Sequence, residues 1–135
     1  MTGTPQPNAP SWRRRHWRVL ALLFVLIVPA AIFAAWASAT LRVTYSAGER
    51  AGYVQKISEK GWVCKTWEGE LAQANLPGTM PQIFKFSVRN DSVAHSLERD
   101  MGKQVSVSYQ EHRGVPTTCF GETNYYITNV RRVQP

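Results

Sequence analysis

The chain has 135 residues, with 16 Lys and Arg against 9 Asp and Glu and a formal net charge of +7. Four of the basic residues precede a long apolar run: Arg13, Arg14, Arg15 and Arg18. Residues 40–135 hold twelve Lys and Arg against nine Asp and Glu, a net charge of +3. The charge therefore does not indicate a polynucleotide-binding surface, and the roughly 90 residues outside the run are enough for one small domain only.

The apolar run extends from Val19 to Ala39 without a charged side chain. At 1.5 Å per residue, a helix of this length reaches about 30 Å, the thickness of the hydrocarbon core of a bilayer. Pro29 lies inside the run, but membrane helices tolerate proline. The run predicts a transmembrane signal-anchor helix over residues 19–39 that holds the chain in the lipid bilayer.

The arginines before the run predict its orientation. Because positive residues stay on the cytoplasmic side, residues 1–18 are expected to form a disordered basic cytoplasmic tail. Residues 40–48 are then a tether, and residues 49–135 form an extracytoplasmic domain. A cleaved signal peptide is the alternative, because Ala37-Ser38-Ala39 has an A-x-A pattern. An apolar run of about 21 residues is longer than a signal peptide needs and favours the uncleaved anchor.

The two cysteines, Cys64 and Cys119, both lie in the part that is expected to be exported. A disulfide persists in an oxidising compartment, so we expect these two residues to form one. Closing a loop of roughly 55 residues stabilises a domain by about 4 kcal/mol in the chain-entropy model. Two free buried thiols are the alternative, and no metal site is expected because no second ligand lies at the right spacing.

Runs of β-formers and the alternation of apolar and polar residues predict five strands in the exported part, although the alternation is imperfect in the second strand. They are, in chain order, Arg50–Ser58, Trp62–Leu71, Phe84–Val88, Val105–Gln110 and Tyr125–Val133. Residues 58–61 are expected to form a hairpin turn, residues 72–82 a loop, and Gly69 a β-bulge.

One short helix is expected between the third and the fourth strand. Asn90-Asp91-Ser92 supplies N-cap chemistry, and Gly102 ends the helix. The expected buried stripe is Val93, Leu97 and Met101.

The element order predicts a mainly β fold with one short helix: a small OB-like five-stranded barrel (β-β-β-α-β-β) after one transmembrane helix. Another small, partly open five-stranded barrel or sandwich is the alternative. In an OB fold the first hairpin loop and the loop between the last two strands lie at one end. Cys64 lies beside the first loop and Cys119 in the second, so the fold and the disulfide support each other.

Aromatic and charged side chains gather on the second strand and in the long connection 111–124. OB folds use such surfaces to bind single strands or sugars, although some of the aromatic side chains are needed for the core. The residues expected to bind a ligand are Trp62, Lys65, Trp67, Glu68, Glu70, Arg113, Phe120, Glu122 and Tyr125. Lys85 and Arg89 add basic side chains to the same surface.

The expected function is a non-enzymatic, membrane-anchored binding or assembly module with an envelope protein or ligand as its partner. No catalytic residue and no cofactor are expected. A location outside the cytoplasm argues against nucleic acid as the partner. The alternative is a small cell-envelope enzyme in which Glu68, Glu70 or Glu122 carries out acid/base chemistry.

Residues 48–53, 61–71 and 113–125 resemble a family of small bacterial membrane-anchored proteins of uncharacterised function, and the resemblance covers most of residues 45–133. It implies a bacterial cytoplasmic membrane with the C-terminal domain in the periplasm. Members of the family sometimes carry a 6-phosphogluconate dehydrogenase label. The sequence does not support that label, because it has no G-x-G-x-x-G motif and no room for a dinucleotide domain.

An anchor followed by an exported OB-like barrel is also similar to the periplasmic haem chaperone of cytochrome c maturation. That family has a tyrosine four residues after its haem-binding histidine. Here Pro116 stands four residues after His112, so haem is not expected as a cofactor.

Overall fold

The computed structural model describes residues 3–4, 12–73 and 77–133. The chain divides into two compact units, residues 1–35 and residues 36–135. Residues 1–2 and 5–11 of the tail predicted over residues 1–18 lie outside the described residues, as do residues 74–76 of the predicted loop. Residues 12–18 of that tail belong to a helix.

Helix α1 (Trp12–Arg42) contains the whole predicted apolar run, with Pro29 inside it. Its segment His16–Arg42 is long and apolar enough to cross a membrane, and its apolar side chains are mostly exposed. A signal sequence near the N-terminus has the same properties. The helix ends only at Arg42 and the first strand starts at Ser46, so the link between them is residues 43–45 rather than the predicted tether 40–48.

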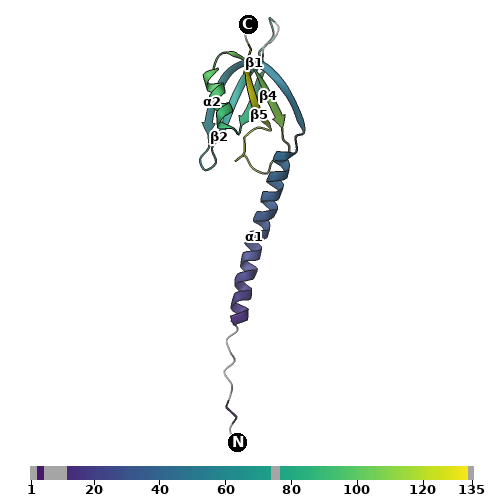
Figure 1. The fold of residues 1–135 in the computed structure, drawn as a ribbon, viewed down its shortest axis with the longest axis vertical. Coiled ribbons are helices and arrows are strands. Elements are labelled where there is room, and N and C mark those ends of the chain that lie inside the picture. The colour runs from purple at the N-terminus through teal and green to yellow at the C-terminus, as the bar shows by residue number, and fades with distance from the viewer. Residues whose placement is uncertain (1–2, 5–11, 74–76, 134–135) are drawn as a thin grey trace. The chain divides into compact units, whose positions relative to one another are not determined.

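Five strands and a second helix follow in the predicted order (Figure 1). They are β1 (Ser46–Lys60), β2 (Thr66–Gln73), β3 (Ile83–Val88), α2 (Asp91–Arg99), β4 (Gln104–Glu111) and β5 (Tyr125–Arg132). The strands form a closed ring in the order β1-β2-β3-β5-β4. Only one parallel pair, Ser87 with Tyr126, closes the ring between β3 and β5. The mainly β, OB-like fold is confirmed. Of the neighbouring strand pairs in the ring, β3 and β5 share the fewest paired residues.

Strand β1 is long because it pairs with two neighbours. Its first half pairs with β4 and its second half with β2, both antiparallel. The register shift lies between Val54 and Lys56 in β1, so the bulge predicted at Gly69 is wrong. Gly69 instead makes room for an aromatic ring, because a Cβ there would lie 2.4 Å from Phe86.

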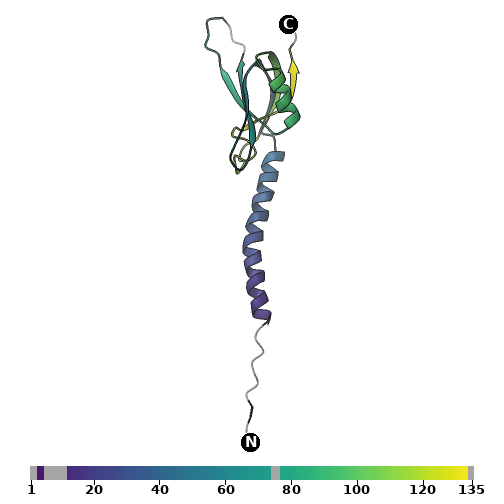
Figure 2. The same ribbon diagram turned by 90° about the vertical axis from the view of Figure 1, so that its left-hand side faces the viewer.

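Inward-facing side chains of the strands and α2 fill the interior. The buried core consists of Val54, Leu71, Phe84, Phe86, Val88, Ala94, Leu97, Val105, Val107 and Ile127. Helix α2 lies against the barrel near β5 (Figure 2) and buries Ala94 and Leu97. Its N-cap is the predicted Asn90, whose side chain accepts a hydrogen bond from Ser92 N at 2.9 Å. Met101 lies beyond the end of the helix and is 42% exposed, so its predicted burial is wrong.

The hairpin between β1 and β2 also differs from the prediction. Strand β1 continues to Lys60, and β2 begins at Thr66. Trp62 and Val63, which were expected to start the return strand, therefore lie in a loop and are fully exposed. Both residues are strong β-formers, but the tight loop at residues 61–65 leaves them without a partner strand.

Candidate functional site

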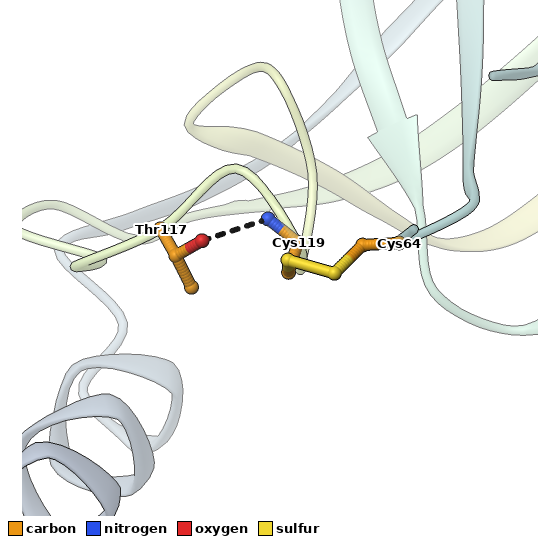
Figure 3. Close-up of a disulfide and its surroundings, with 3 residues drawn as sticks. All are labelled: Cys64, Thr117 and Cys119. Atoms are coloured by element: carbon orange, nitrogen blue, oxygen red, sulfur yellow. Dashed lines mark hydrogen bonds between the residues drawn. A yellow bond between two sulfur atoms is a disulfide. The ribbon is translucent and has the colours of Figure 1, made fainter. Parts of the chain in front are cut away.

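A disulfide joins Cys64, just before β2, to Cys119 in the β4–β5 connection (Figure 3). The Cys119 backbone N–H also donates a hydrogen bond to Thr117 Oγ1 at 3.2 Å. The predicted pairing is confirmed. The β1–β2 loop and the β4–β5 connection therefore lie together at one end of the barrel.

Buried polar side chains around Glu68 attach the β4–β5 connection to the sheet. The Glu68 carboxylate accepts hydrogen bonds from Thr66 Oγ1 at 2.8 Å and Ser87 Oγ at 2.7 Å. It also accepts one from the backbone N–H of Glu122 at 2.9 Å. Glu68 is only 6% exposed. Its position in sequence suggested a ligand contact, but its surroundings indicate a structural role.

The connection packs tightly beside this carboxylate. Ser87 Oγ, which donates to Glu68, also accepts a hydrogen bond from Thr123 N at 3.1 Å. A Cβ at Gly121 would lie 2.7 Å from the Ser87 side chain and 2.8 Å from Tyr126. The pKa of Tyr126 is raised, first because burial disfavours the phenolate and second because Glu68 is close, while Arg89 lowers it. Catalysis by Glu68 is not favoured by these contacts.

The structure distributes the nine predicted ligand residues over several places. Glu68, Glu70 and Glu122 border a hollow of about 90 Å³ on the outer face of β2. Lys65, Trp67 and Phe120 border a second one of about 150 Å³ near the disulfide. Tyr125 lines a third and larger cleft. Trp62 lies on the exposed loop, and Arg113 lies near the start of the β4–β5 connection, so the nine residues do not form one site.

In the two smaller hollows, the lining side chains compensate one another's charges or hydrogen-bond to one another. In the first, three lysines, Lys56, Lys60 and Lys85, face the three glutamates, and Lys60 lies 3.7 Å from Glu122. In the second, Trp67 donates a hydrogen bond to Asp91 at 3.0 Å. Neither hollow presents an uncompensated charge that points to a ligand class.

The largest cleft, of about 570 Å³, opens between β3 and β5, where only one residue pair holds the strands together. We call it the Arg50 cleft. It is lined by Arg50, Gln73, Gln82, Ile83, Phe84, Lys85, Thr123, Asn124 and Tyr125. Its volume lies within the range of small-molecule sites, about 300–1,000 Å³.

Arg50 points into this cleft from the inner face of β1. Its guanidinium carbon lies 4.5 Å from the centre of the Phe84 ring and 5.5 Å from that of Tyr109. Tyr125 packs edge-on against both of these rings. Among the residues that the structure describes, Arg50 has neither an ion pair nor a hydrogen bond. The cleft therefore holds a half-buried cation whose N–H groups donate to no described residue.

Arg50 was missed as a site residue, although the sequence carried a signal. Gly48, Arg50, Gly52 and Val54 alternate along β1, and Val54 is a core residue. Residues two apart in a strand share a face, so Arg50 had to point inward. An arginine on an inward face, with a glycine two residues before it and another two residues after it, indicates a cation held inside the barrel.

Three other arginines of the barrel have ion pairs with described residues, whereas Arg50 has none. Arg131 lies 3.0 Å from Glu49, and Arg132 pairs with Asp100. Arg113 donates to Glu111 at 2.8 Å, and this hydrogen bond raises the pKa of the guanidinium.

Comparison with known proteins identifies the fold. No curated protein sequence matches the chain. Among solved structures, the chain is similar to the mitochondrial single-stranded DNA binding protein Rim1 of S. cerevisiae, with a TM-score of 0.50 and 10% sequence identity. The similarity covers 68% of this chain and 97% of that protein. At this identity the likeness shows the fold alone.

This similarity corrects one expectation about partners. Nucleic acid was excluded from the sequence because of the expected location of the domain. A single-stranded DNA binding protein has the same fold, so the exclusion is wrong, and nucleic acid has to be tested as a ligand.

The family is shown by a match that covers residues 43–135, which is more than half of the chain. The matching family model is described as a domain of unknown function, DUF8785. The matched residues contain all five strands, α2 and both cysteines. The chain therefore belongs to the family of this domain of unknown function, DUF8785.

Proposed function

We propose that this protein is a membrane-anchored binding module that holds an acidic group of its ligand in the Arg50 cleft. The observation that carries the proposal is the Arg50 guanidinium, which lies over the Phe84 and Tyr109 rings and has no ion pair or hydrogen bond with a described residue. The barrel scaffold positions the cleft, and no catalytic step is assigned to it.

Anchoring and export are part of the proposal. Helix α1 is long and apolar enough to span a bilayer, and four arginines stand at its N-terminal end. Positive residues favour the cytoplasmic side, so residues 43–135 are placed outside the cytoplasm. The Cys64–Cys119 disulfide supports this orientation, because disulfides persist in oxidising compartments. The membrane that we propose is a bacterial cytoplasmic membrane, as the family resemblance of residues 48–53, 61–71 and 113–125 implies.

The chemistry of Arg50 favours an anion. Removing a guanidinium from water costs free energy unless other groups replace its hydrogen bonds. Contacts with aromatic faces recover about 0.5–2 kcal/mol, but they leave the five N–H donors unsatisfied. A carboxylate or phosphate accepts two of them side by side, in a geometry that suits arginine better than lysine. Lys85, which also faces the glutamates of the first hollow, lies at the edge of the cleft.

The rest of the cleft suits a ligand with both polar and apolar parts. Gln73, Gln82 and Asn124 present amide groups that can donate and accept hydrogen bonds. Ile83 is 47% exposed and offers an apolar contact. A few polar groups around an apolar floor are typical of small-molecule sites. The ligand class is therefore an organic acid, or an acidic group on a larger envelope molecule.

Replacing Arg50 with methionine tests the proposal. The full chain is extracted from membranes in mild detergent, and copurifying molecules are identified by mass spectrometry. Hydrogen bonds to a charged group are worth about 1.5–3 kcal/mol, so Arg50→Met is expected to lower the retained acidic ligand by about 10- to 100-fold. Arg50→Lys keeps the positive charge but lacks the planar guanidinium group, so it should retain an intermediate amount of the acidic ligand.

Arg99→Met is the matched control. Arg99 is an exposed arginine on α2 that contacts Ser96 Oγ, so this variant should retain as much ligand as the wild type. The proposal would be contradicted if wild type and Arg50→Met unfold at the same temperature and yet retain equal amounts of the acidic molecule. So would a wild-type chain that copurifies with no acidic molecule.

Single-stranded nucleic acid is a second candidate, because phosphate is an acid and the fold is that of a single-stranded DNA binding protein. Lys56, Lys85 and Arg89 are exposed near β2 and β3 and can follow a phosphate backbone. A fluorescent oligothymidylate titrated into the detergent-solubilised chain tests it. Binding that weakens steeply with salt supports nucleic acid. Nucleic acid is rejected as the ligand if the copurified ligand resists nuclease and the chain does not bind oligothymidylate.

A further inference from the structure

The β1–β2 loop, residues 61–65, exposes two large apolar side chains at its tip. Trp62 has a relative exposure of 102% and Val63 one of 97%. Neither packs against any part of the barrel. Exposed apolar patches in a stable protein usually mark a surface that another molecule covers.

The loop is held in place by two constraints. The Cys64–Cys119 disulfide fixes its C-terminal side. Gly61 has a φ of +128°, and a Cβ there would lie 1.8 Å from the carbonyl oxygen of Cys64. The tight turn keeps Trp62 and Val63 directed away from the barrel, so their exposure does not result from a loose chain.

The tip lies at the end of the barrel where the chain enters. His112 Nδ1 lies 3.0 Å from the carbonyl oxygen of Val43, and Tyr45 N donates to the carbonyl oxygen of Glu111 at 2.8 Å. Both contacts join the residues that follow α1 to the β4–β5 connection. Cys119 in that connection holds the β1–β2 loop. These groups belong to one compact unit, residues 36–135.

Aromatic and basic side chains surround this entry point. Tyr45 is 63% exposed, and the Arg113 guanidinium carbon lies 3.8 Å from the centre of its ring. Arg42 and Lys65 are exposed as well. Trp and Tyr are enriched at the membrane–water interface, and each basic side chain near an anionic surface contributes about 1 kcal/mol. This end of the barrel has the composition of a membrane-contacting surface.

We infer that the β1–β2 loop is a second membrane contact, which inserts Trp62 and Val63 into the interfacial region of the bilayer that α1 crosses. The inference rests on the membrane anchoring proposed above. The occupant is the lipid surface, because the chain leaves the bilayer at this end of the barrel and basic residues flank the tip. A second contact restricts rotation of the barrel about the 43–45 link and so gives the Arg50 cleft one orientation to the membrane.

Quenching by brominated lipids tests the inference in the full chain. Wild type and Trp62→Phe are reconstituted into vesicles of phosphatidylcholine and phosphatidylglycerol, with and without bromine near the top of the acyl chains. The difference between their emission spectra isolates Trp62. We expect this difference to be blue-shifted and to fall on the order of twofold with brominated lipid, because an interfacial indole lies at that depth. Trp67→Phe is the control, since the Trp67 indole is bound to Asp91 on the barrel, and its difference spectrum should not respond to bromine.

Three failures are distinguishable. A chain that incorporates into vesicles and resists carbonate extraction, but whose Trp62 emission stays unquenched by bromine, overturns the second contact and leaves the anchor intact. A blue shift that depends on protein concentration and not on bromine means that a second copy covers the loop, and it also overturns the inference. A chain that carbonate removes overturns the anchor, and the second contact with it.

Discussion

Reducing the Cys64–Cys119 disulfide is expected to lower the free energy of unfolding of the barrel by about 4 kcal/mol. The two cysteines are 55 residues apart, and opening a loop of this length increases the conformational entropy of the unfolded chain. A small domain is stable by only about 5–15 kcal/mol, so the loss is a large part of the total. Urea unfolding of the full chain in detergent, followed by fluorescence with and without reductant, measures the difference.

The double variant Cys64→Ala, Cys119→Ala is the control. It should unfold at the same urea concentration as the reduced wild type and should not respond to reductant. If the reductant changes nothing in the wild type, the cross-link does not stabilise the barrel. If the reductant shifts both proteins equally, the shift has another cause.

Replacing Glu68 with alanine is expected to cost about 3–5 kcal/mol of stability. The substitution removes the acceptor of three hydrogen bonds, from Thr66, Ser87 and the Glu122 backbone. Buried donors left without an acceptor cost about 1–3 kcal/mol each. The β4–β5 connection should also loosen, because the Glu122 contact attaches it to β2. Chemical unfolding measures the loss of stability, and hydrogen exchange at Glu122 and Thr123 measures the loosening.

Glu70→Ala is the matched control for Glu68. Glu70 lies two residues further along β2 on the same face, and it is half-buried with no hydrogen bond among the described residues. Its loss should change the stability by about 0.5 kcal/mol or less. Equal effects of the two substitutions would show that Glu68 has no special structural role.

Local patterns were sufficient to predict much of the barrel. The alternation of Phe84, Phe86 and Val88 predicted β3, and all three residues are buried. The N-cap at Asn90 was predicted from side-chain chemistry, which acts within a few residues. The disulfide was expected because both cysteines lie in the part predicted to be exported. The element order supported it, because an OB fold brings Cys64 and Cys119 to one end. Each of these features depends on local sequence or on the order of elements.

Features that depend on three-dimensional packing were not predicted. Glu68 was expected to contact a ligand, but it is buried because the β4–β5 connection folds over it. Gly69 looked like a bulge, but its role is to admit the Phe86 ring from the neighbouring strand. The Arg50 cleft exists because β3 and β5 share a single pair, and pairing between distant strands cannot be read from either one.

The position of Trp62 shows a different difficulty. Its β-propensity favoured a strand, yet the tight turn that begins at Gly61 holds it outside the sheet. Tertiary context often overrides propensity in this way.

Photo-crosslinking from the Arg50 cleft in living cells tests the central claim most directly. Benzoylphenylalanine is placed at Ile83, which lines the cleft, or at Thr128, an exposed residue of β5 that does not line it. We expect an adduct with an acidic molecule from Ile83 and none from Thr128, and we expect the Ile83 adduct to be lost when Arg50 is replaced with methionine. An Ile83 adduct that persists unchanged in the Arg50→Met background would contradict the assignment of Arg50 as the anion-binding residue.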